Sequence, residues 1–240
     1  MQGLPPIRFA KIDAQLLRKE IATSHPVILE IGCNDGGHTQ WFLRIFDNPR
    51  IYCFEPDPRA VQRFKRRIGH RENVHLFELA LSDSTGEIEF FQSSGTRPSK
   101  PGGQPDDWDK SGSVRKPKDH LRVHPWVKFS EVITVPTMTL DDWCTSQGIE
   151  QIDFIWMDVQ GAEMDVFRGA ARTLERTHLL YTEYSNREMY KGQASLKVLL
   201  KHLSRFEVLV RFPEDVLLKH RNWQGPPQAS ITKPLEPDLT

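Results

Sequence analysis

The sequence predicts an α/β protein with a mostly parallel sheet that carries helices on both faces. Short apolar runs of strand length alternate along the chain with segments whose apolar residues recur at helical spacing. Strands that alternate with helices form parallel sheets, because each helical connection returns the chain to the same end of the sheet. The chain of 240 residues is also long enough to bury a sizeable core around such a sheet.

The first half of the chain contains the clearest strand–helix units. Val27 to Ile31 is an apolar run of strand length, and a glycine-rich turn separates it from an amphipathic segment. Asp57 is a suitable N-cap for the next helix, because Pro58 then occupies the first helical position. The elements expected here are strands at 27–31, 51–54, 74–81 and 87–90, with helices at 38–46 and 58–68.

The second half repeats the alternation and ends in a hairpin. Apolar residues at 164, 167, 171 and 174 share one helical face, so a single helix is predicted over 164–174. Segments 206–212 and 215–219 are expected to close the sheet as a hairpin with an antiparallel C-terminal strand. The other expected elements are strands at 152–159 and 179–184, a helix that starts at the Thr139 cap, and a helix at 196–203.

One long polar segment interrupts this pattern. Residues 92–119 are rich in glycine, proline, serine and lysine and contain almost no apolar side chain besides Trp108. A loop of this length is usually a functional lid or a disordered insertion, and the sequence favours neither. We therefore expect a single domain over residues 1–220 with a polar insertion at about 92–130, followed by an irregular tail at 221–240.

Composition argues against several classes of protein. Lys+Arg and Asp+Glu both number 32, and a formal net charge of zero does not fit a polycation that coats nucleic acid or an anionic membrane. No apolar stretch approaches the roughly 20 residues of a membrane span, and the N-terminus lacks the apolar core of a signal peptide. The widely spaced Cys33, Cys53 and Cys144 indicate reduced thiols in a cytoplasmic protein.

The turn after the first strand has the features of a ligand-binding loop. Gly32 and Gly36 permit close backbone approach, and the N–H groups that open the next helix favour a polar or negative group. The spacing is neither GxGxxG nor GxxxxGK, so pyrophosphate and triphosphate loops are not indicated. Glu55 ends the second strand, 23 residues after Gly32, where an acid accepts hydrogen bonds from a ribose diol. Glu55 could also be an ordinary acid at the start of a helix, but Asp57 is the better cap for that helix. The glycine turn and Glu55 together therefore predict an adenosine-bearing ligand.

Four stretches resemble one protein family. Leu29 to Gly36, LEIGCNDG, resembles the glycine motif of class I S-adenosylmethionine-dependent methyltransferases. The stretches that narrow the resemblance to the FkbM-type methyltransferases are Ala80–Asp83 with Gly86–Glu87, Val135–Asp142, and Ile152–Glu163. The resemblance runs from about Val27 to Tyr184. Gln160 is a departure, because the family usually has glutamate there.

The resemblance implies a Rossmann-like class I methyltransferase fold with a seven-stranded sheet. It also implies transfer of a methyl group from S-adenosylmethionine, mostly to an oxygen of a small molecule or sugar. By the same resemblance, Glu30, Gly32, Asn34 and Gly36 surround the methionine part of the cofactor, Glu55 binds its ribose, and Ser82 and Asp83 lie near its adenine.

Carboxylates at the ends of neighbouring strands are the candidate catalytic groups. Asp158 lies at the end of the strand predicted over 152–159, beside the expected position of the cofactor's methyl group, and Glu183 lies at the end of the strand predicted over 179–184. With Glu163, they are suited to orient an acceptor hydroxyl, to act as base, or to hold Mg²⁺, which the sequence does not establish. Asp158 is the first candidate base and His38 the second, whereas Glu163 is equally well explained as an acid in the first turn of a helix.

Two other functions are consistent with the same fold. A basic run over 59–71 is most simply a solvated helix face, but it would also serve an RNA methyltransferase. A non-catalytic cofactor-binding module is disfavoured, because Glu30, Gly32, Glu55 and Asp158 are all present. We expect a small-molecule or glycosidic acceptor and no nucleic-acid or membrane partner, and the sequence leaves the acceptor's identity and the oligomeric state open.

Overall fold

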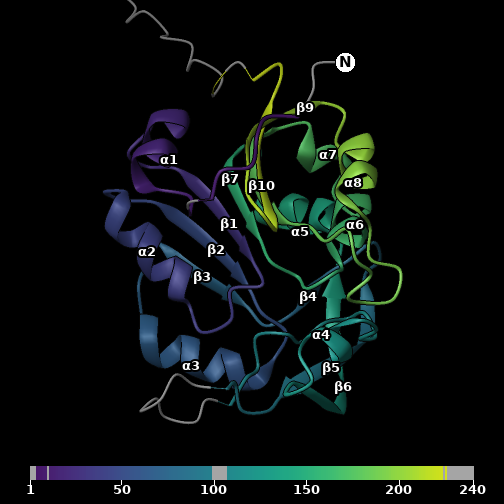
Figure 1. The fold of residues 1–240 in the computed structure, drawn as a ribbon. Helices are drawn as coiled ribbons and strands as arrows, with labels where there is room; N and C mark the ends of the chain where they lie inside the picture. Colours follow the sequence, from purple (N-terminus) through teal and green to yellow (C-terminus); the bar gives the residue numbers. More distant parts are fainter. Residues whose placement is uncertain (1–3, 10, 99–106, 224, 226–240) are drawn as a thin grey trace, which may run out of the picture.

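Seven strands form the main sheet of the computed structural model, which describes residues 4–9, 11–98, 107–223 and 225 (Figure 1). The strand order is β3-β2-β1-β7-β8-β10-β9, and β10 runs antiparallel to both of its neighbours while the other six strands share one direction. The strands are β1 (Val27–Ile31), β2 (Arg50–Phe54), β3 (Val74–Phe77), β7 (Ile152–Met157), β8 (Thr177–Glu183), β9 (Phe206–Arg211) and β10 (Asp215–His220). This arrangement confirms the predicted fold class, including its C-terminal antiparallel strand.

Helices cover both faces of the main sheet, as predicted (Figure 1). One face carries α1 (Ala14–Ile21), α2 (Gly37–Ile45) and α3 (Pro58–Ile68), and the other carries α5 (Leu140–Gln147), α6 (Glu163–Arg168), α7 (Ala171–Leu174) and α8 (Leu196–His202). The pleat sends alternate strand residues into these two cores: Ile28 packs with Phe42 of α2, whereas Leu29 packs on the side of Trp143 of α5.

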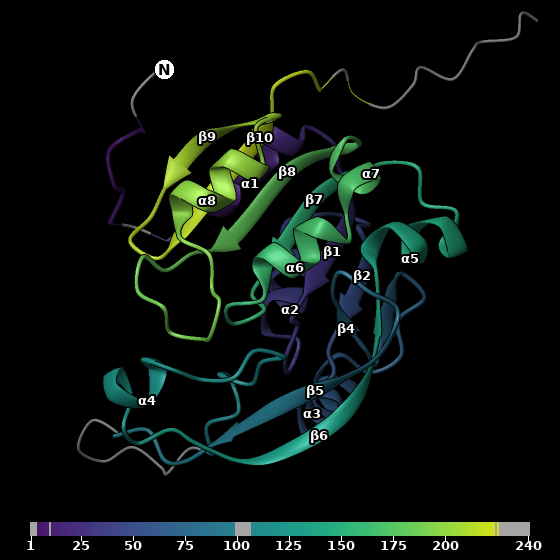
Figure 2. The ribbon, with the colours of Figure 1, turned by 90° about the vertical axis from the view of Figure 1, so that its right-hand side faces the viewer.

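A second, three-stranded sheet lies beside the main one, and the sequence prediction was wrong here (Figure 2). The predicted strand at 74–81 is two strands, because the chain leaves the main sheet after Phe77 and pairs again as β4 (Ala80–Leu81). β4 runs parallel to β6 (Lys128–Met138), which also pairs with β5 (Gly86–Ser94) in an antiparallel ribbon. The predicted strand at 87–90 is part of β5, and β6 was not predicted.

The single helix predicted over 164–174 is also wrong. It divides into α6 and α7 at Gly169, whose carbonyl oxygen accepts a hydrogen bond of 2.9 Å from the Asp141 amide. A Cβ atom on Gly169 would lie 2.1 Å from the Ser82 carbonyl oxygen. The missing side chain at Gly169 therefore lets the backbone that follows β4 approach the end of α6 closely.

The polar insertion is the connection between β5 and β6. Its described part contains the short helix α4 (His120–Val123), and residues 99–106 of the predicted insertion lie outside the described residues. Most of the predicted tail, residues 224 and 226–240, also lies outside them. In the part of the chain that the structure describes, no helix has the length and apolar character needed to cross a membrane.

Candidate functional site

A cavity of about 250 Å³ opens at the carboxyl ends of the parallel strands. β1 pairs with β2 on one side and with β7 on the other. The connection after β1 leads to β2 and the connection after β7 leads to β8, so the chain leaves the carboxyl ends of these two adjacent strands in opposite directions. In open α/β sheets this switch point leaves a crevice in which ligands bind. Predicted site residues that line the cavity are Gly32, Asn34, His38, Glu55 and Asp158.

The turn after β1 packs tightly against both neighbouring strands. The Gly32 and Cys33 amides both donate to the Phe54 carbonyl oxygen of β2, each at 3.0 Å. On the other side, a Cβ atom on Gly32 would lie 1.9 Å from the Asp158 carbonyl oxygen. Gly32 also has a φ of +82°, which residues with a side chain rarely adopt. Only glycine fits between the ends of β2 and β7 at this position.

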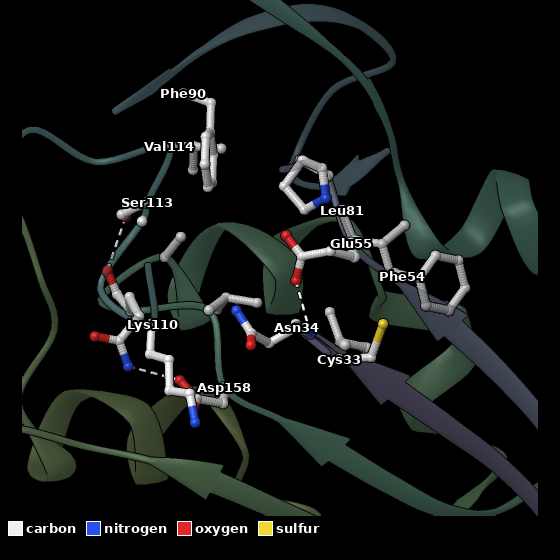
Figure 3. Close-up of a pocket in the computed structure, with 18 of the residues that line it drawn as sticks. Cys33, Asn34, Phe54, Glu55, Leu81, Phe90, Lys110, Ser113, Val114 and Asp158 are labelled. Carbon is white, nitrogen blue, oxygen red and sulfur yellow. Dashed lines mark hydrogen bonds between the residues drawn. The ribbon is translucent and has the colours of Figure 1, made fainter. Parts of the chain in front are cut away.

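Glu55 and Asn34 form the centre of the cavity wall (Figure 3). The Asn34 amide donates to Glu55 Oε2 and the Asp57 amide donates to Oε1, both at 2.8 Å. Burial raises the pKa of Glu55 to about 7, and these two amide bonds oppose the rise. Asn34 Oδ1 is buried and has no hydrogen-bond partner among the described residues, so it is free to accept from a ligand.

Glu30 and Gly36 lie behind the turn and do not line the cavity. Glu30 is fully buried, its Oε2 accepts from the Thr39 hydroxyl, and burial raises its pKa to about 8. Gly36 is the N-cap of α2, and a Cβ atom there would meet the side chains of Phe64 and Ile68 at 2.9 Å. Both residues therefore stabilise the turn between β1 and α2 from the side that faces away from the cavity.

One end of the cavity is apolar. Leu81 lies on one side, and Phe90 and Val114 lie together across from it (Figure 3). Pro56 also lines the cavity. Phe90 comes from β5 and Val114 from the insertion, so the second sheet and the insertion complete a wall that the main sheet leaves open. This end has the shape and chemistry for a flat aromatic group.

Ser82 and Asp83 do not line the cavity, although the family resemblance implied a place near the adenine. The Ser82 amide donates to the Met138 carbonyl oxygen at 3.1 Å, and its own carbonyl group faces Gly169. The chain enters the second sheet through β4, and this carries residues 82 and 83 past the cavity. Leu79, Ala80 and Leu81 line it instead.

The other end of the cavity is polar and contains Asp158 and Gln160. Gln160 Nε2 donates to Asp158 Oδ1 at 2.6 Å and to Glu183 Oε2 at 2.9 Å. Glu183 does not itself line the cavity and lies behind Gln160. Burial raises the pKa of Asp158, and burial together with the nearby Asp158 charge raises the pKa of Glu183 further.

His38 faces the polar end, whereas Glu163 does not. The His38 ring centroid lies 4.2 Å from that of Trp156, and burial followed by the charge of Lys110 lowers the pKa of His38. Glu163 Oε1 accepts from the Gly161 amide at 3.0 Å, and burial raises its pKa to about 7. Glu163 therefore stabilises the turn that leads into α6.

The insertion forms a roof over the cavity, which we define as residues 107–119. Asp109, Lys110, Gly112, Ser113 and Val114 line the cavity from this side. The Lys110 side chain extends toward Asp158 (Figure 3), and its charge partly offsets the burial that raises the pKa of that carboxyl group. No local sequence pattern marks these residues, because the roof has no helical or strand periodicity.

Ion pairs and hydrogen bonds fasten the roof on several sides. Arg63 of α3 pairs with Asp109, and Arg115 Nε donates to Asp165 Oδ2 of α6 at 2.6 Å. The Ser113 hydroxyl donates to the Gln160 carbonyl oxygen at 2.8 Å. The described part of the insertion is thus attached to both helical layers.

The basic residues of α3 mostly contact acids of the same chain. Besides the Arg63–Asp109 pair, Arg59 pairs with Asp57 at 2.6 Å and Arg67 pairs with Asp35 at 2.6 Å. Asp35 and Asp109 both line the cavity. This helix face therefore holds the cavity walls together.

The acidic side chains near the cavity can be compared with the grouping that metal ligands require. Within residues 4–9, 11–98, 107–223 and 225, no group of three or more His, Cys, Asp or Glu side chains is placed to hold a metal ion. The acidic side chains instead bond to amides: Asp158 and Glu183 to Gln160, and Glu163 to Gly161.

Comparison with known proteins agrees with this geometry. The model of the methyltransferase FkbM domain matches residues 30–211. The 2-O-methyltransferase NoeI of Sinorhizobium fredii is 47% identical over 199 residues, which are 81% of this chain and 79% of NoeI. Methyltransferase sdnD of Sordaria araneosa is 27% identical, with 67% of this chain and 70% of that protein covered.

Solved structures are more distant. The N-methyltransferase NodS of Bradyrhizobium japonicum in complex with S-adenosyl-L-homocysteine has 13% sequence identity and a TM-score of 0.43, over 86% of this chain and 84% of NodS. The family match covers well over half of the sequence, and the NoeI match covers most of both proteins. The chain belongs to the FkbM family of S-adenosylmethionine-dependent methyltransferases.

Proposed function

We propose that this enzyme transfers a methyl group from S-adenosylmethionine to a hydroxyl oxygen of a small glycosidic acceptor, with Asp158 as the proton acceptor. The observation that carries the proposal is the single cavity that joins Glu55 and the apolar end to Asp158 at the polar end. The likeness to a 2-O-methyltransferase supports a hydroxyl as the acceptor group.

The lining residues fit S-adenosylmethionine in one orientation. The apolar end between Leu81 and Phe90 suits the adenine, and Glu55 is placed to accept from the ribose hydroxyls. The buried and unpartnered Asn34 Oδ1 suits the ammonium group of the methionine part. Bound in this way, the cofactor would leave Asp158 and the polar end to receive the acceptor.

The bound cofactor supplies the methyl group and a sulfur leaving group that keeps the electron pair of the broken carbon–sulfur bond. The chain must align the acceptor oxygen with that carbon and take the hydroxyl proton. Asp158 lines the polar end and, in its ionised form, accepts this proton. His38 lines the same end with a lowered pKa and is the second candidate.

A small acceptor is favoured over RNA by the contacts of α3. Three of the arginines that an RNA-binding face would use are paired with Asp57, Asp109 and Asp35. Breaking such pairs to bind phosphates would weaken the attachment of the cavity walls. The relationship to NoeI likewise favours an enzyme over a non-catalytic module.

The test is transfer of a labelled methyl group from S-adenosylmethionine to a panel of methyl glycosides, with structured RNA as a separate arm. We expect label in a glycoside and none in RNA. Arms with Mg²⁺ and with a chelator distinguish two roles for the carboxyl groups, because a base acts in both arms and a metal site acts in only one. Label found only in RNA would overturn the proposal.

Replacing Glu55 with alanine is expected to weaken S-adenosylmethionine binding by about 10- to 100-fold. The change removes charge-assisted hydrogen bonds to the ribose, each worth roughly 1.5–3 kcal/mol before water compensates. Calorimetric titration of the folded variant measures the effect. Glu89→Ala, an exposed glutamate of β5, is the matched control and should bind normally. An unchanged Kd for Glu55→Ala would remove Glu55 from the ribose site.

The ion pair between α3 and the roof yields a second prediction. Arg63→Gln removes the partner of the buried Asp109. We expect the free energy of cofactor binding to weaken by about 1 kcal/mol, which is a roughly fivefold loss of affinity. Limited proteolysis should also cut within residues 107–119 faster than in the wild type. Arg66→Gln, on the same helix but with no ion pair among the described residues, is the control.

Of the two interpretations of residues 92–119, a functional lid leads to a prediction for the roof, residues 107–119. Cofactor plus a proven acceptor should slow cleavage within 107–119, because contacts to the ligand add to those that already fasten the roof. Equal cleavage with and without ligands would show that the roof is a fixed wall.

A further inference from the structure

The side chain of Gln160 lies between the two carboxyl groups at the polar end of the cavity. Its Nε2 carries two protons and has two acceptors within reach, Asp158 Oδ1 at 2.6 Å and Glu183 Oε2 at 2.9 Å. Asp158 directly follows β7 and Glu183 is the last residue of β8, so one amide links the ends of two adjacent strands. This contact uses the full donor capacity of the amide nitrogen.

The Tyr190 hydroxyl lies at the oxygen end of that amide. It lies 3.0 Å from Gln160 Oε1 and 2.8 Å from the Ser111 carbonyl oxygen, and its single proton is donated to one of these acceptors at a time. The Tyr190 side chain is buried and packs on Gly161, where a Cβ atom would meet it at 2.8 Å. A flipped amide would turn its nitrogen to Tyr190 and its oxygen toward two carboxyl groups.

The backbone of Gln160 is held as firmly as its side chain. Its carbonyl oxygen accepts the Ser113 hydroxyl of the roof at 2.8 Å, and its φ is +51°. A residue with a side chain adopts this left-handed conformation only where the surroundings require it. The conformation turns the side chain back over Asp158, two residues earlier in the chain.

We propose that Gln160 is a positioning residue: its amide holds the Asp158 and Glu183 carboxyl groups in place and stabilises the negative charge on Asp158. The proposal rests on the proposed function, in which Asp158 accepts the proton. Glutamine suits this role better than glutamate, because glutamate would add a third carboxyl group at hydrogen-bond distance from the other two. Gln160, at which this chain departs from the glutamate usual in the family, would thus position the two carboxyl groups.

Other charges act on the same pair. Hydrogen bonding to the Glu183 side chain and the charge of Lys110 in the roof both favour the ionised form of Asp158, whereas the charge of Asp158 disfavours ionisation of Glu183. Around Glu183, the carboxyl groups of Asp215, Glu163 and Glu214 all disfavour ionisation. In such acidic surroundings, an N–H donor from an uncharged side chain lowers the cost of the charge on Asp158, while the second N–H of the same amide holds Glu183.

The test follows the carboxyl groups directly by carbon-13 NMR of protein labelled at its aspartate and glutamate carboxyl carbons. Spectra of Asp158→Asn and Glu183→Gln assign the two resonances. In Gln160→Glu, we expect the titration midpoint of Asp158 to rise by about one pH unit or more, because a like charge replaces a donor. The control Gln62→Glu, at an exposed position of α3, should leave the midpoint unchanged.

Tyr190→Phe keeps the test informative if Gln160→Glu does not fold. Without the hydroxyl, Gln160 Oε1 loses a donor and the amide is held less firmly, so the Asp158 midpoint should rise in the same direction by a smaller amount. Unchanged midpoints in the folded variants would overturn the role of Gln160. This outcome differs from failure of the proposed function, in which Asp158→Asn retains its methyl-transfer rate whatever the NMR shows.

Discussion

Asp158→Asn is expected to lower the rate of methyl transfer by about 10²–10⁴-fold, the usual contribution of a general base. The asparagine keeps the shape of the side chain and its place at the polar end of the cavity but cannot accept the acceptor's proton. Cofactor affinity should change much less than in Glu55→Ala, because Asp158 and Glu55 lie at different parts of the cavity. Single-turnover transfer at saturating cofactor separates the rate from binding.

Two companion variants show whether the effect belongs to Asp158 itself. Glu183→Gln should reduce the rate less, because Glu183 lies behind Gln160 and does not line the cavity. His38→Gln tests the second candidate, whose side chain does line it. A near wild-type rate for Asp158→Asn, with a large loss in His38→Gln, would transfer the role of base to His38.

The pH dependence follows from the environment of Asp158. Burial raises the pKa of its carboxyl group, so the proton-accepting form is lost as the pH falls through that raised value. The rate of transfer should therefore increase with pH in the wild type. Asp158→Asn has no carboxyl group to ionise at this position, so the same increase should be absent from its residual rate.

Strand ends explain which parts of the site were predictable from sequence. Gly32, Glu55 and Asp158 each follow an apolar run that forms a parallel strand, and the carboxyl ends of such strands meet at one edge. Local sequence thus brings these three residues together once the fold class is known. The structure places all of them on the cavity wall.

The remaining wall depends on tertiary contacts that no local pattern records. Residues 82 and 83 miss the cavity because the chain changes sheets after Phe77, and the apolar run through Leu81 gave no sign of that change. Lys110 and Val114 reach the cavity because ion pairs such as Arg63–Asp109 hold the roof over it. The alternation at 87–90 predicted a strand, but it did not indicate that Phe90 would line a cavity.

The second large effect is expected at Gly32, where alanine should destabilise the fold by about 3 kcal/mol or more and abolish cofactor binding. A left-handed φ alone costs a residue with a side chain roughly 1–2 kcal/mol. At Gly32, a Cβ atom would also lie 1.9 Å from the Asp158 carbonyl oxygen, so β1 and β7 must move apart at their carboxyl ends. That movement displaces both the turn and Asp158.

Gly148→Ala provides the matched control for Gly32→Ala. Gly148 ends α5 with a φ of +64°, and a Cβ atom there would meet nothing within 4 Å. Alanine at 148 therefore introduces the backbone cost alone, about 1–2 kcal/mol, and leaves the cavity intact. Chemical unfolding and cofactor titration of both variants isolate the effect of the close approach to Asp158. Equal losses of stability, with normal cofactor binding in Gly32→Ala, would show that the β1–β7 contact tolerates a side chain and that the turn is not what shapes the cavity.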